Sequence, residues 1–213
     1  IEVVLAKAEG ELGVILAEAA QQIASKADPS QFDLEEIAKE VARLKHSFMA
    51  TINALQKQCG EAGEFVHYGP TTQDIVDTGT VLQLKQAFAI VERDTRLVAL
   101  ELKKLAKQYQ YLPMVGRTHG MQALPTTFGF KLAVWLDEFV RHLARLKEIK
   151  QRVLVGNISG AICTYASFGN KGPQVEQRTL ELLGLNTPNI GWQSARDRFS
   201  EYASVIALIS GTL

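Results

Sequence analysis

The chain has 213 residues, of which 46% are hydrophobic, and its 23 basic and 23 acidic side chains balance. This neutrality argues against nucleic acid or a charged membrane surface as the main partner, and no apolar run approaches the ~20 residues of a membrane span. The two cysteines, Cys59 and Cys163, fit neither a disulfide framework nor a metal-ligand spacing. We therefore expect a cytoplasmic protein that binds no metal, no nucleic acid and no membrane.

Apolar residues at helical spacing dominate the first sixty positions. They predict one helix over residues 1–26 and a second that begins after Asp33 and continues to Leu55. Ile1 and Leu213 both fall inside helical patterns without capping residues. We therefore expect the chain to be a piece of a longer protein.

A polar loop follows, over residues 64–78, and holds His67 and the paired hydroxyls of Thr71 and Thr72. A hydroxyl-rich loop that leads into a helix can present donors to an anion. The structural alternative is that the threonines and Asp74 only cap the next helix. The residues leave both interpretations open.

Two long helices form the centre of the predicted fold. Apolar residues from Val81 to Tyr109 alternate spacings of three and four, which predicts a helix of about 30 residues, about 45 Å long. A second amphipathic pattern runs from Phe128 to Ile149, and either Thr126 or Thr127 is expected to cap it. Joined through residues 111–126, these helices would make an antiparallel pair.

The turn between the long helices carries side chains suited to catalysis. Arg117 is a permanent cation suited to carboxylates, Thr118 adds a hydroxyl, and His119 titrates near neutrality. Such a group in a non-helical turn suits an enzyme that handles an anionic substrate by proton transfer. The alternative is a helix cap with a histidine of no special role.

The last third is irregular and then helical. Residues 156–173 hold four glycines with polar residues between them, which predicts a segment that packs tightly or exposes backbone amides. A final helix is expected after a cap at Gln193 or Ser194, with Arg196 and Arg198 in its first turn. Arginines oppose the helix dipole there, which suggests either an anionic ligand or a surface ion pair.

No segment shows a strand period, so we predict an all-α protein, an elongated bundle of long antiparallel helices. We expect a helical N-terminal domain over residues 1–78 and the first part of a central long-helix domain over residues 79–213. The same bundle would also suit a non-catalytic oligomerisation scaffold. A scaffold, however, gives no reason for polar loops with histidine and arginine at several helix ends.

Taken together, the loops resemble the signature regions of the aspartase/fumarase superfamily, over nearly the whole chain. The matching motifs are His67-Tyr68-Gly69-Pro70-Thr71-Thr72-Gln73-Asp74, Gly116-Arg117-Thr118-His119-Gly120, Pro125-Thr126-Thr127-Phe128-Gly129, Ser159-Gly160-Ala161 with Thr164-Tyr165-Ala166, and Arg196-Asp197-Arg198. Lys45-His46 also resembles a histidine-bearing helix that lines the site in the adenylosuccinate lyase branch.

This resemblance implies a homotetramer whose active sites combine loops of three subunits, and a β-elimination that releases fumarate without a cofactor. It implies His119 as the acid beside Thr118, and Thr71 and Thr72 as ligands of the fumaryl carboxylate of a small dicarboxylate substrate. Further substrate contacts are expected from His46, His67, Tyr68, Gln73, Arg117, Ser159, Arg196 and Arg198. The loop with the catalytic base should lie downstream of Leu213, so the fragment alone is expected to be inactive.

The resemblance favours a carbon–nitrogen lyase of the adenylosuccinate type, which acts in purine biosynthesis. Gln122 and Cys163 depart from that branch, whereas Trp192 and Gln73 are more similar to 3-carboxy-cis,cis-muconate cycloisomerases. The cycloisomerase is therefore the second reading. The Thr-His-Gly of residues 118–120, often missing in cycloisomerases, favours the lyase.

Overall fold

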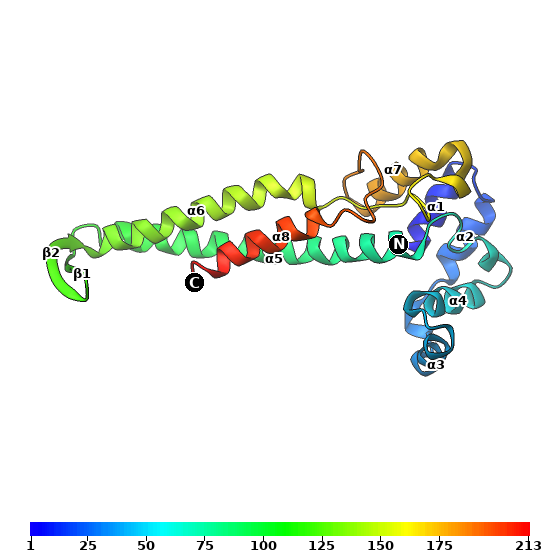
Figure 1. The fold of residues 1–213 in the computed structure, drawn as a ribbon, viewed down its shortest axis with the longest axis horizontal. Coiled ribbons are helices and arrows are strands. Elements are labelled where there is room, and N and C mark those ends of the chain that lie inside the picture. The colour runs from blue at the N-terminus through cyan, green and yellow to red at the C-terminus, as the bar shows by residue number, and fades with distance from the viewer. The chain divides into compact units, whose positions relative to one another are not determined.

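A computed structural model describes all residues, 1–213, and confirms the predicted all-α class (Figure 1). The α-helices are α1 (Glu2–Glu11), α2 (Ala17–Lys26), α3 (Leu34–Leu44), α4 (Ser47–Cys59), α5 (Thr72–Gln108), α6 (Phe128–Val153), α7 (Gly172–Leu183) and α8 (Asp197–Ser210). Three short 3-10 helices, η1 (Pro29–Gln31), η2 (Gly60–Phe65) and η3 (Ala166–Lys171), lie between them. No helix is both long and apolar enough to cross a membrane.

The chain divides into two compact units, and α5 runs from one into the other. The first holds residues 1–83 and 154–196, and the second holds residues 84–153 and 197–213. The predicted domain boundary between residues 78 and 79 stays a prediction.

The single helix expected over residues 1–26 is wrong, because the chain breaks between α1 and α2. Gly13 adopts a positive φ of 64° at this break, a conformation that glycine takes without strain. Gly10 lets the two helices approach closely, since a Cβ there would lie 2.7 Å from Cβ of Ala20. The apolar residues of α1, α2 and α4 then share one core, around Ile23, Ile52 and neighbouring buried residues.

A second expected helix is also divided. Asp33 caps α3 as predicted, accepting from the backbone N–H groups of Glu35 and Glu36. The helix ends at Leu44, however, because Lys45 takes a left-handed conformation with φ of 56°. His46 then caps α4, its Nδ1 accepting from the N–H of Met49 at 3.2 Å. The break therefore fixes the place of the His46 ring at a helix start.

The predicted antiparallel pair of long helices is present in the second unit. At one end, Gly129 of α6 lies so close to α5 that a Cβ would stand 2.6 Å from the Ala106 carbonyl. Toward the other end, Lys150 of α6 donates to Glu92 of α5 at 2.7 Å. Helix α8 packs on α6, where Arg152 and Glu201 form a bidentate ion pair.

The turn between α5 and α6 is a β-hairpin. No strand was predicted here, because the sequence shows no strand period. Strand β1 (Pro113–Thr118) pairs antiparallel with β2 (Met121–Thr127). His119 and Gly120 form the two-residue loop, with φ of 51° and 72°, and positive φ at both positions is what a tight hairpin turn requires. Thr127 caps α6 as expected, accepting from the N–H of Phe130 at 3.2 Å.

The last helix begins later than expected. Helix α8 starts at Asp197, so Arg196 precedes it and only Arg198 lies in its first turn. Helix α7 ends at Leu183, and Gly184 follows it with a left-handed φ of 63°. The segment between α6 and α7 is irregular and buried over residues 153–160.

Candidate active site

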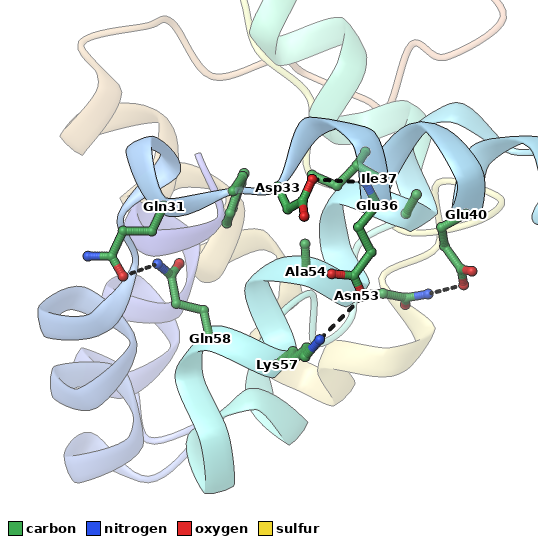
Figure 2. A pocket seen from close by; sticks show the side chains of 11 residues that line it. Gln31, Asp33, Glu36, Ile37, Glu40, Asn53, Ala54, Lys57 and Gln58 are labelled. Carbon is green, nitrogen blue, oxygen red and sulfur yellow. Dashed lines mark hydrogen bonds and ion pairs between the residues drawn. The ribbon is translucent and has the colours of Figure 1, made fainter.

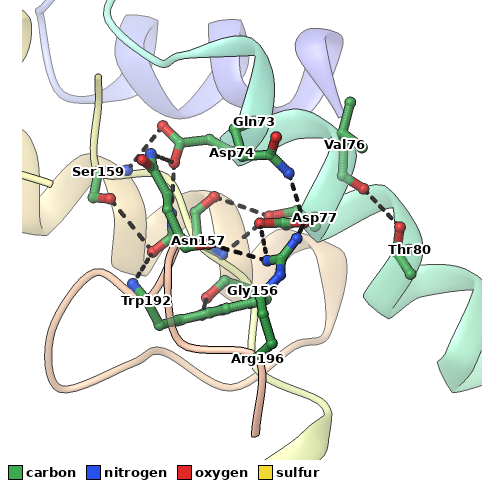
Figure 3. Close-up of polar contacts among 12 residues, drawn as sticks. Gln73, Asp74, Val76, Asp77, Thr80, Gly156, Asn157, Ser159, Trp192 and Arg196 are labelled. Atoms are coloured by element: carbon green, nitrogen blue, oxygen red, sulfur yellow. Dashed lines mark hydrogen bonds and ion pairs between the residues drawn. The ribbon is translucent and has the colours of Figure 1, made fainter. Parts of the chain in front are cut away.

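Polar side chains from three separate segments converge in the first unit (Figure 3). One segment is the first two turns of α5, the second is the buried stretch 156–160, and the third is the loop 192–196 before α8. The sequence placed candidate residues in each segment, and the structure brings the segments together.

Asp74 is the centre of this cluster. Its side chain is fully buried and accepts from the N–H groups of Thr71 at 3.1 Å, Ser159 at 3.2 Å and Gly160 at 2.8 Å. The side-chain amides of Asn157 and Gln193 add donors at 2.5 and 2.8 Å. Burial raises the pKa of Asp74, and these hydrogen bonds act in the opposite direction. One carboxylate therefore joins all three segments.

Asp74 also explains why α5 begins where it does. It lies three residues after Thr71, and its side chain returns to the N–H of Thr71, which is one half of a capping box. The sequence-based reading of Asp74 as a cap is therefore confirmed. Because Thr71 is tied to the buried cluster in this way, the start of α5 is held in a fixed position.

Asn157 forms a second set of hydrogen bonds within the cluster. Its N–H donates to the Thr78 hydroxyl at 3.0 Å, and that hydroxyl donates to the Asn157 carbonyl at 2.9 Å. Its side-chain oxygen accepts from the N–H of Trp192 at 3.1 Å and from the hydroxyl of Ser159 at 3.3 Å. Ser159, a candidate substrate ligand, is thus buried and oriented within the cluster.

Arg196 approaches α5 from the third segment. Its Nη1 and Nη2 donate to the two carboxylate oxygens of Asp77 at 2.7 and 2.9 Å, and Gln73 donates to Asp77 at 2.9 Å. Asp77 is buried, whereas the Arg196 side chain is 47% exposed. The ion pair therefore directs the Arg196 guanidinium, while the side chain stays partly exposed to solvent.

The remaining candidates of the first unit lie around the start of α5. Nε2 of His46 stands 3.5 Å from the Thr72 hydroxyl, at the outer limit of a hydrogen bond. His67 is paired with Glu2, and Tyr68 is 41% exposed. Between them and Thr71, Gly69 lies against Phe168, because a Cβ on Gly69 would come within 2.4 Å of that ring.

The other candidates belong to the second unit. Arg117, Thr118 and His119 lie at the tip of the β1–β2 hairpin, where all three are exposed and their side chains make no hydrogen bond or ion pair. Arg198 donates to the backbone carbonyl of Arg152. The roles assigned to these residues, and to those of the first unit, stay predictions.

Several members of the cluster were not candidates from the sequence. Asp77 and Asn157 gave no local signal, and Gln193 was expected only as a possible helix cap. Their partners in the cluster lie 83 or 119 positions away in the chain and are set by the fold alone. Glu2 likewise gave none. Asp74 was expected as a cap of the next helix, but its contacts with the other two segments were not.

A cavity lies elsewhere in the first unit, between α3 and α4 (Figure 2). It has a volume of about 450 Å³, and its rim carries Asp33, Glu36 and Glu40 with one cation, Lys57. Glu36 pairs with Lys57 at 3.3 Å and Glu40 with Arg43 at 2.5 Å. Its acidic rim would repel an anionic substrate, so this cavity is not the candidate active site.

The cluster around the start of α5 also contains two carboxylates, Asp74 and Asp77, but both are buried and hydrogen-bonded, and donors surround them. The N-terminus of a long helix carries a partial positive charge and free N–H groups, and here it is flanked by two threonine hydroxyls, a histidine and an arginine. These are groups that bind carboxylates. No group of three or more histidine, cysteine, aspartate or glutamate residues is arranged to hold a metal ion.

Comparison with known proteins agrees with this chemistry. A protein-family model described as a lyase matches residues 1–213. The chain is 72% identical to an N-acetyl-S-(2-succino)cysteine lyase of Dickeya dadantii, covering all of this chain and 47% of that protein. It is 42% identical to an adenylosuccinate lyase of Pyrococcus abyssi, covering 48% of it. The chain thus spans about half the length of the curated relatives it matches.

Solved structures share the fold. A fumarate lyase from Mesorhizobium sp. BNC1 superimposes with a TM-score of 0.95 at 42% identity, over 99% of this chain and 50% of that one. A 3-carboxy-cis,cis-muconate lactonizing enzyme from Pseudomonas putida gives a TM-score of 0.93 at 36% identity, over 99% and 49%.

Proposed function

The chain belongs to the aspartase/fumarase superfamily of lyases, and from this premise we propose that the full-length protein cleaves the carbon–sulfur bond of N-acetyl-S-(2-succino)cysteine. The observation that carries the proposal is the 72% identity, along the entire chain, to a lyase named for that substrate, against 42% to an adenylosuccinate lyase. The anion-binding character of the α5 start supports it, because the substrate is a succinyl dicarboxylate joined to sulfur.

The proposed reaction is a β-elimination. A base removes a proton from the succinyl CH₂ group, which lies next to one carboxylate, and the electron pair moves to form the carbon–carbon double bond of fumarate. The carbon–sulfur bond breaks, and the sulfur leaves with its electron pair and takes up a proton. The products are one fumarate and one N-acetylcysteine, with no oxidant, metal or cofactor involved.

We assign proton donation to the leaving sulfur to His119, with Thr118 and Arg117 beside it at the hairpin tip. Thr71 and Thr72 would hold a fumaryl carboxylate at the start of α5, where the helix dipole favours negative charge. The contacts to the rest of the substrate are assigned to His46, His67, Tyr68, Gln73, Ser159, Arg196 and Arg198. A general acid typically contributes about 10²- to 10⁴-fold to the rate.

We also propose that the site is completed by other copies of the chain in a homotetramer. The hairpin side chains Arg117, Thr118 and His119 have no partner within the chain. Large apolar side chains of α5 and α6 are exposed along the same unit, including Leu97, Leu100, Phe130, Val134, Trp135 and Val140. Exposed apolar surface of this extent marks association sites. Sedimentation velocity should give a tetramer, and a stable monomer would contradict this assembly.

Adenylosuccinate is the second candidate substrate, favoured by the 42% identity to an adenylosuccinate lyase and by the resemblance of the loops to that branch. The reaction would be the same elimination with nitrogen in place of sulfur. A cytoplasmic location is proposed with either substrate.

The test is product identification with the full-length protein. Incubation with N-acetyl-S-(2-succino)cysteine should release fumarate, followed by its ultraviolet absorbance, and free thiol, followed with a chromogenic disulfide, in a ratio of one to one. Release of fumarate from adenylosuccinate but not from N-acetyl-S-(2-succino)cysteine would make adenylosuccinate the substrate. Conversion of 3-carboxy-cis,cis-muconate without fumarate would overturn both candidates in favour of a cycloisomerase.

A further inference from the structure

His67 is held by a residue at the start of the chain. Its Nδ1 lies 2.8 Å from Oε1 of Glu2, a residue of α1 that is 65 positions away. The two side chains are only 12% and 9% exposed. The ring of Phe48 meets the His67 ring edge-on, with 6.5 Å between their centroids. The imidazole is therefore fixed both by a hydrogen bond and by an aromatic neighbour.

The chemistry of this contact fixes where the ring proton lies. A carboxylate can only accept, so a hydrogen bond between Glu2 and the His67 ring requires the proton on Nδ1. In the neutral ring, Nε2 then has its lone pair free. Nε2 makes no hydrogen bond within the chain, so it is available to a ligand.

The surroundings of Glu2 make this contact specific. Its second oxygen, Oε2, is buried without a partner, so His67 is the one hydrogen-bond partner of the carboxylate. Glu9 lies two turns further along α1, fully buried, with both carboxyl oxygens unpaired. Burial, with a smaller contribution from the charge of Glu2, raises the pKa of Glu9 to about 9. The protonated form of Glu9 is therefore favoured at neutral pH.

The backbone at His67 supports the same assignment. The residue adopts a left-handed conformation with φ of 63°, which is uncommon for a side chain other than glycine, asparagine or aspartate. Gly69, two residues later, packs against Phe168 and leads to Thr71. The loop between the Glu2 contact and the Asp74 cluster is thus fixed at both ends, and His67 sits at the Glu2 end.

We propose that Glu2 is a positioning residue, which holds His67 with its proton on Nδ1 so that Nε2 accepts a hydrogen bond from the substrate. The proposal rests on the assignment of His67 to substrate binding in the proposed function. The group recognised would be an N–H donor of the part of the substrate that leaves, such as the amide N–H of an N-acetylcysteinyl group. Glu2 touches no reacting atom itself.

The experiment combines kinetics and spectroscopy on the full-length protein carrying Glu2→Gln or Glu2→Ala. Loss of the carboxylate should raise KM for N-acetyl-S-(2-succino)cysteine about tenfold, the size typical of an orienting partner of a histidine, with kcat changed less than about threefold. The amide oxygen of Glu2→Gln can still accept from Nδ1–H, so this variant should keep the tautomer. Glu2→Met has no acceptor oxygen and a similar side-chain volume, so it serves if Glu2→Ala fails to fold. The matched control is Glu11→Gln, on the same helix as Glu2. It removes an exposed ion pair with Arg178 and should leave KM unchanged.

The second readout does not depend on activity. Solid-state ¹⁵N spectra of ¹⁵N-histidine-labelled protein distinguish a protonated from an unprotonated ring nitrogen, and His67→Asn assigns the His67 signals. The parent should carry the proton on Nδ1, and Glu2→Ala should shift it toward Nε2. An unchanged tautomer in Glu2→Ala, or in Glu2→Met if Glu2→Ala fails to fold, overturns the proposal. A shifted tautomer without any turnover of succinyl substrates would overturn the proposed function and leave the positioning of His67 standing.

Discussion

The side chain of Asn157 donates to the Asp74 carboxylate at 2.5 Å, although the two residues are 83 positions apart. This bond ties the first turn of α5 to the segment that follows α6. Donors of Thr71, Ser159, Gly160 and Gln193 converge on the same carboxylate. The positions of the candidate substrate ligands Thr71 and Ser159 therefore depend on one buried aspartate.

Replacement of Asp74 by asparagine should destabilise the full-length protein by about 2–4 kcal/mol, measured by urea unfolding. The amide has one acceptor oxygen in place of two, and its NH₂ group would face backbone N–H donors. The matched control is Asp137→Asn, which removes a carboxylate that is 71% exposed and paired with Arg141. It should change the free energy of unfolding by less than about 1 kcal/mol. Equal losses in both variants would contradict a special role for Asp74.

The pair of Arg196 and Asp77 should show energetic coupling. Removing Arg196 leaves a buried carboxylate without its cation, so Arg196→Met and Asp77→Asn should together cost less than the sum of the single changes. We expect a coupling of about 1 kcal/mol or more from a double-mutant cycle. The more exposed pair of Arg152 and Glu201 serves for comparison and should couple more weakly. Additive losses at Arg196 and Asp77 would show that the ion pair does not hold the arginine.

His119→Gln should lower kcat about 10²-fold or more, as expected for loss of a general acid. The melting temperature should hardly change, because the exposed hairpin side chain makes no hydrogen bond within the chain. Succinylated thiols of lower pKa should lose less activity, since their thiolates leave without a proton. Steady-state kinetics over such a series measures this, and near-normal turnover of the variant would rule out the acid role.

The buried carboxyl of Glu9 should make stability depend on pH. Its pKa rises from 4.5 in the unfolded chain to about 9 in the folded one, so the folded state binds the proton more tightly. The free energy of unfolding should therefore fall as the pH rises from 4.5 to 9, by up to about 1.4 kcal/mol per pH unit. Glu9→Gln removes this dependence.

Thermal unfolding of the Glu9→Gln variant and its parent at several pH values checks the sign. The gain in melting temperature of the variant should be small near pH 5 and should increase toward pH 9. Glu18→Gln, an exposed glutamate at the start of α2, should show no such trend. A constant difference across the range would contradict the burial of a neutral Glu9.

The sequence predicted the long helices well because their signals are local. The alternation of threes and fours from Val81 to Tyr109 is a property of one helix face, and α5 and α6 follow it. The caps at Asp33 and Thr127 are likewise set by neighbours two or three residues away. The break at Lys45 was not predicted, because it needs a left-handed non-glycine residue, for which the sequence pattern gives no sign.

The β-hairpin was not predicted for a different reason. The pairing of β1 and β2 shifts register between Val115 and Arg117, which interrupts any alternation of apolar and polar residues. The His119-Gly120 turn is less typical of a hairpin than asparagine or aspartate before glycine. The sequence could therefore predict a non-helical turn here but not its strands.

For the site, local patterns identified the loops but not the contacts between them. The threonines before α5 and the glycine-rich stretch stood out, whereas their joining through Asp74 and Asn157 depends on tertiary packing. The pairing of Glu2 with His67 links the start of α1 to a loop 65 positions later, a distance over which no periodicity carries information.

The most direct test of the central claim is the ratio of kcat/KM for N-acetyl-S-(2-succino)cysteine and adenylosuccinate, measured on the same preparation of the full-length protein. We expect a ratio above about 10², since a site built to hydrogen-bond one leaving group discriminates strongly against another. A ratio below one would contradict the carbon–sulfur lyase proposal and establish adenylosuccinate as the better substrate.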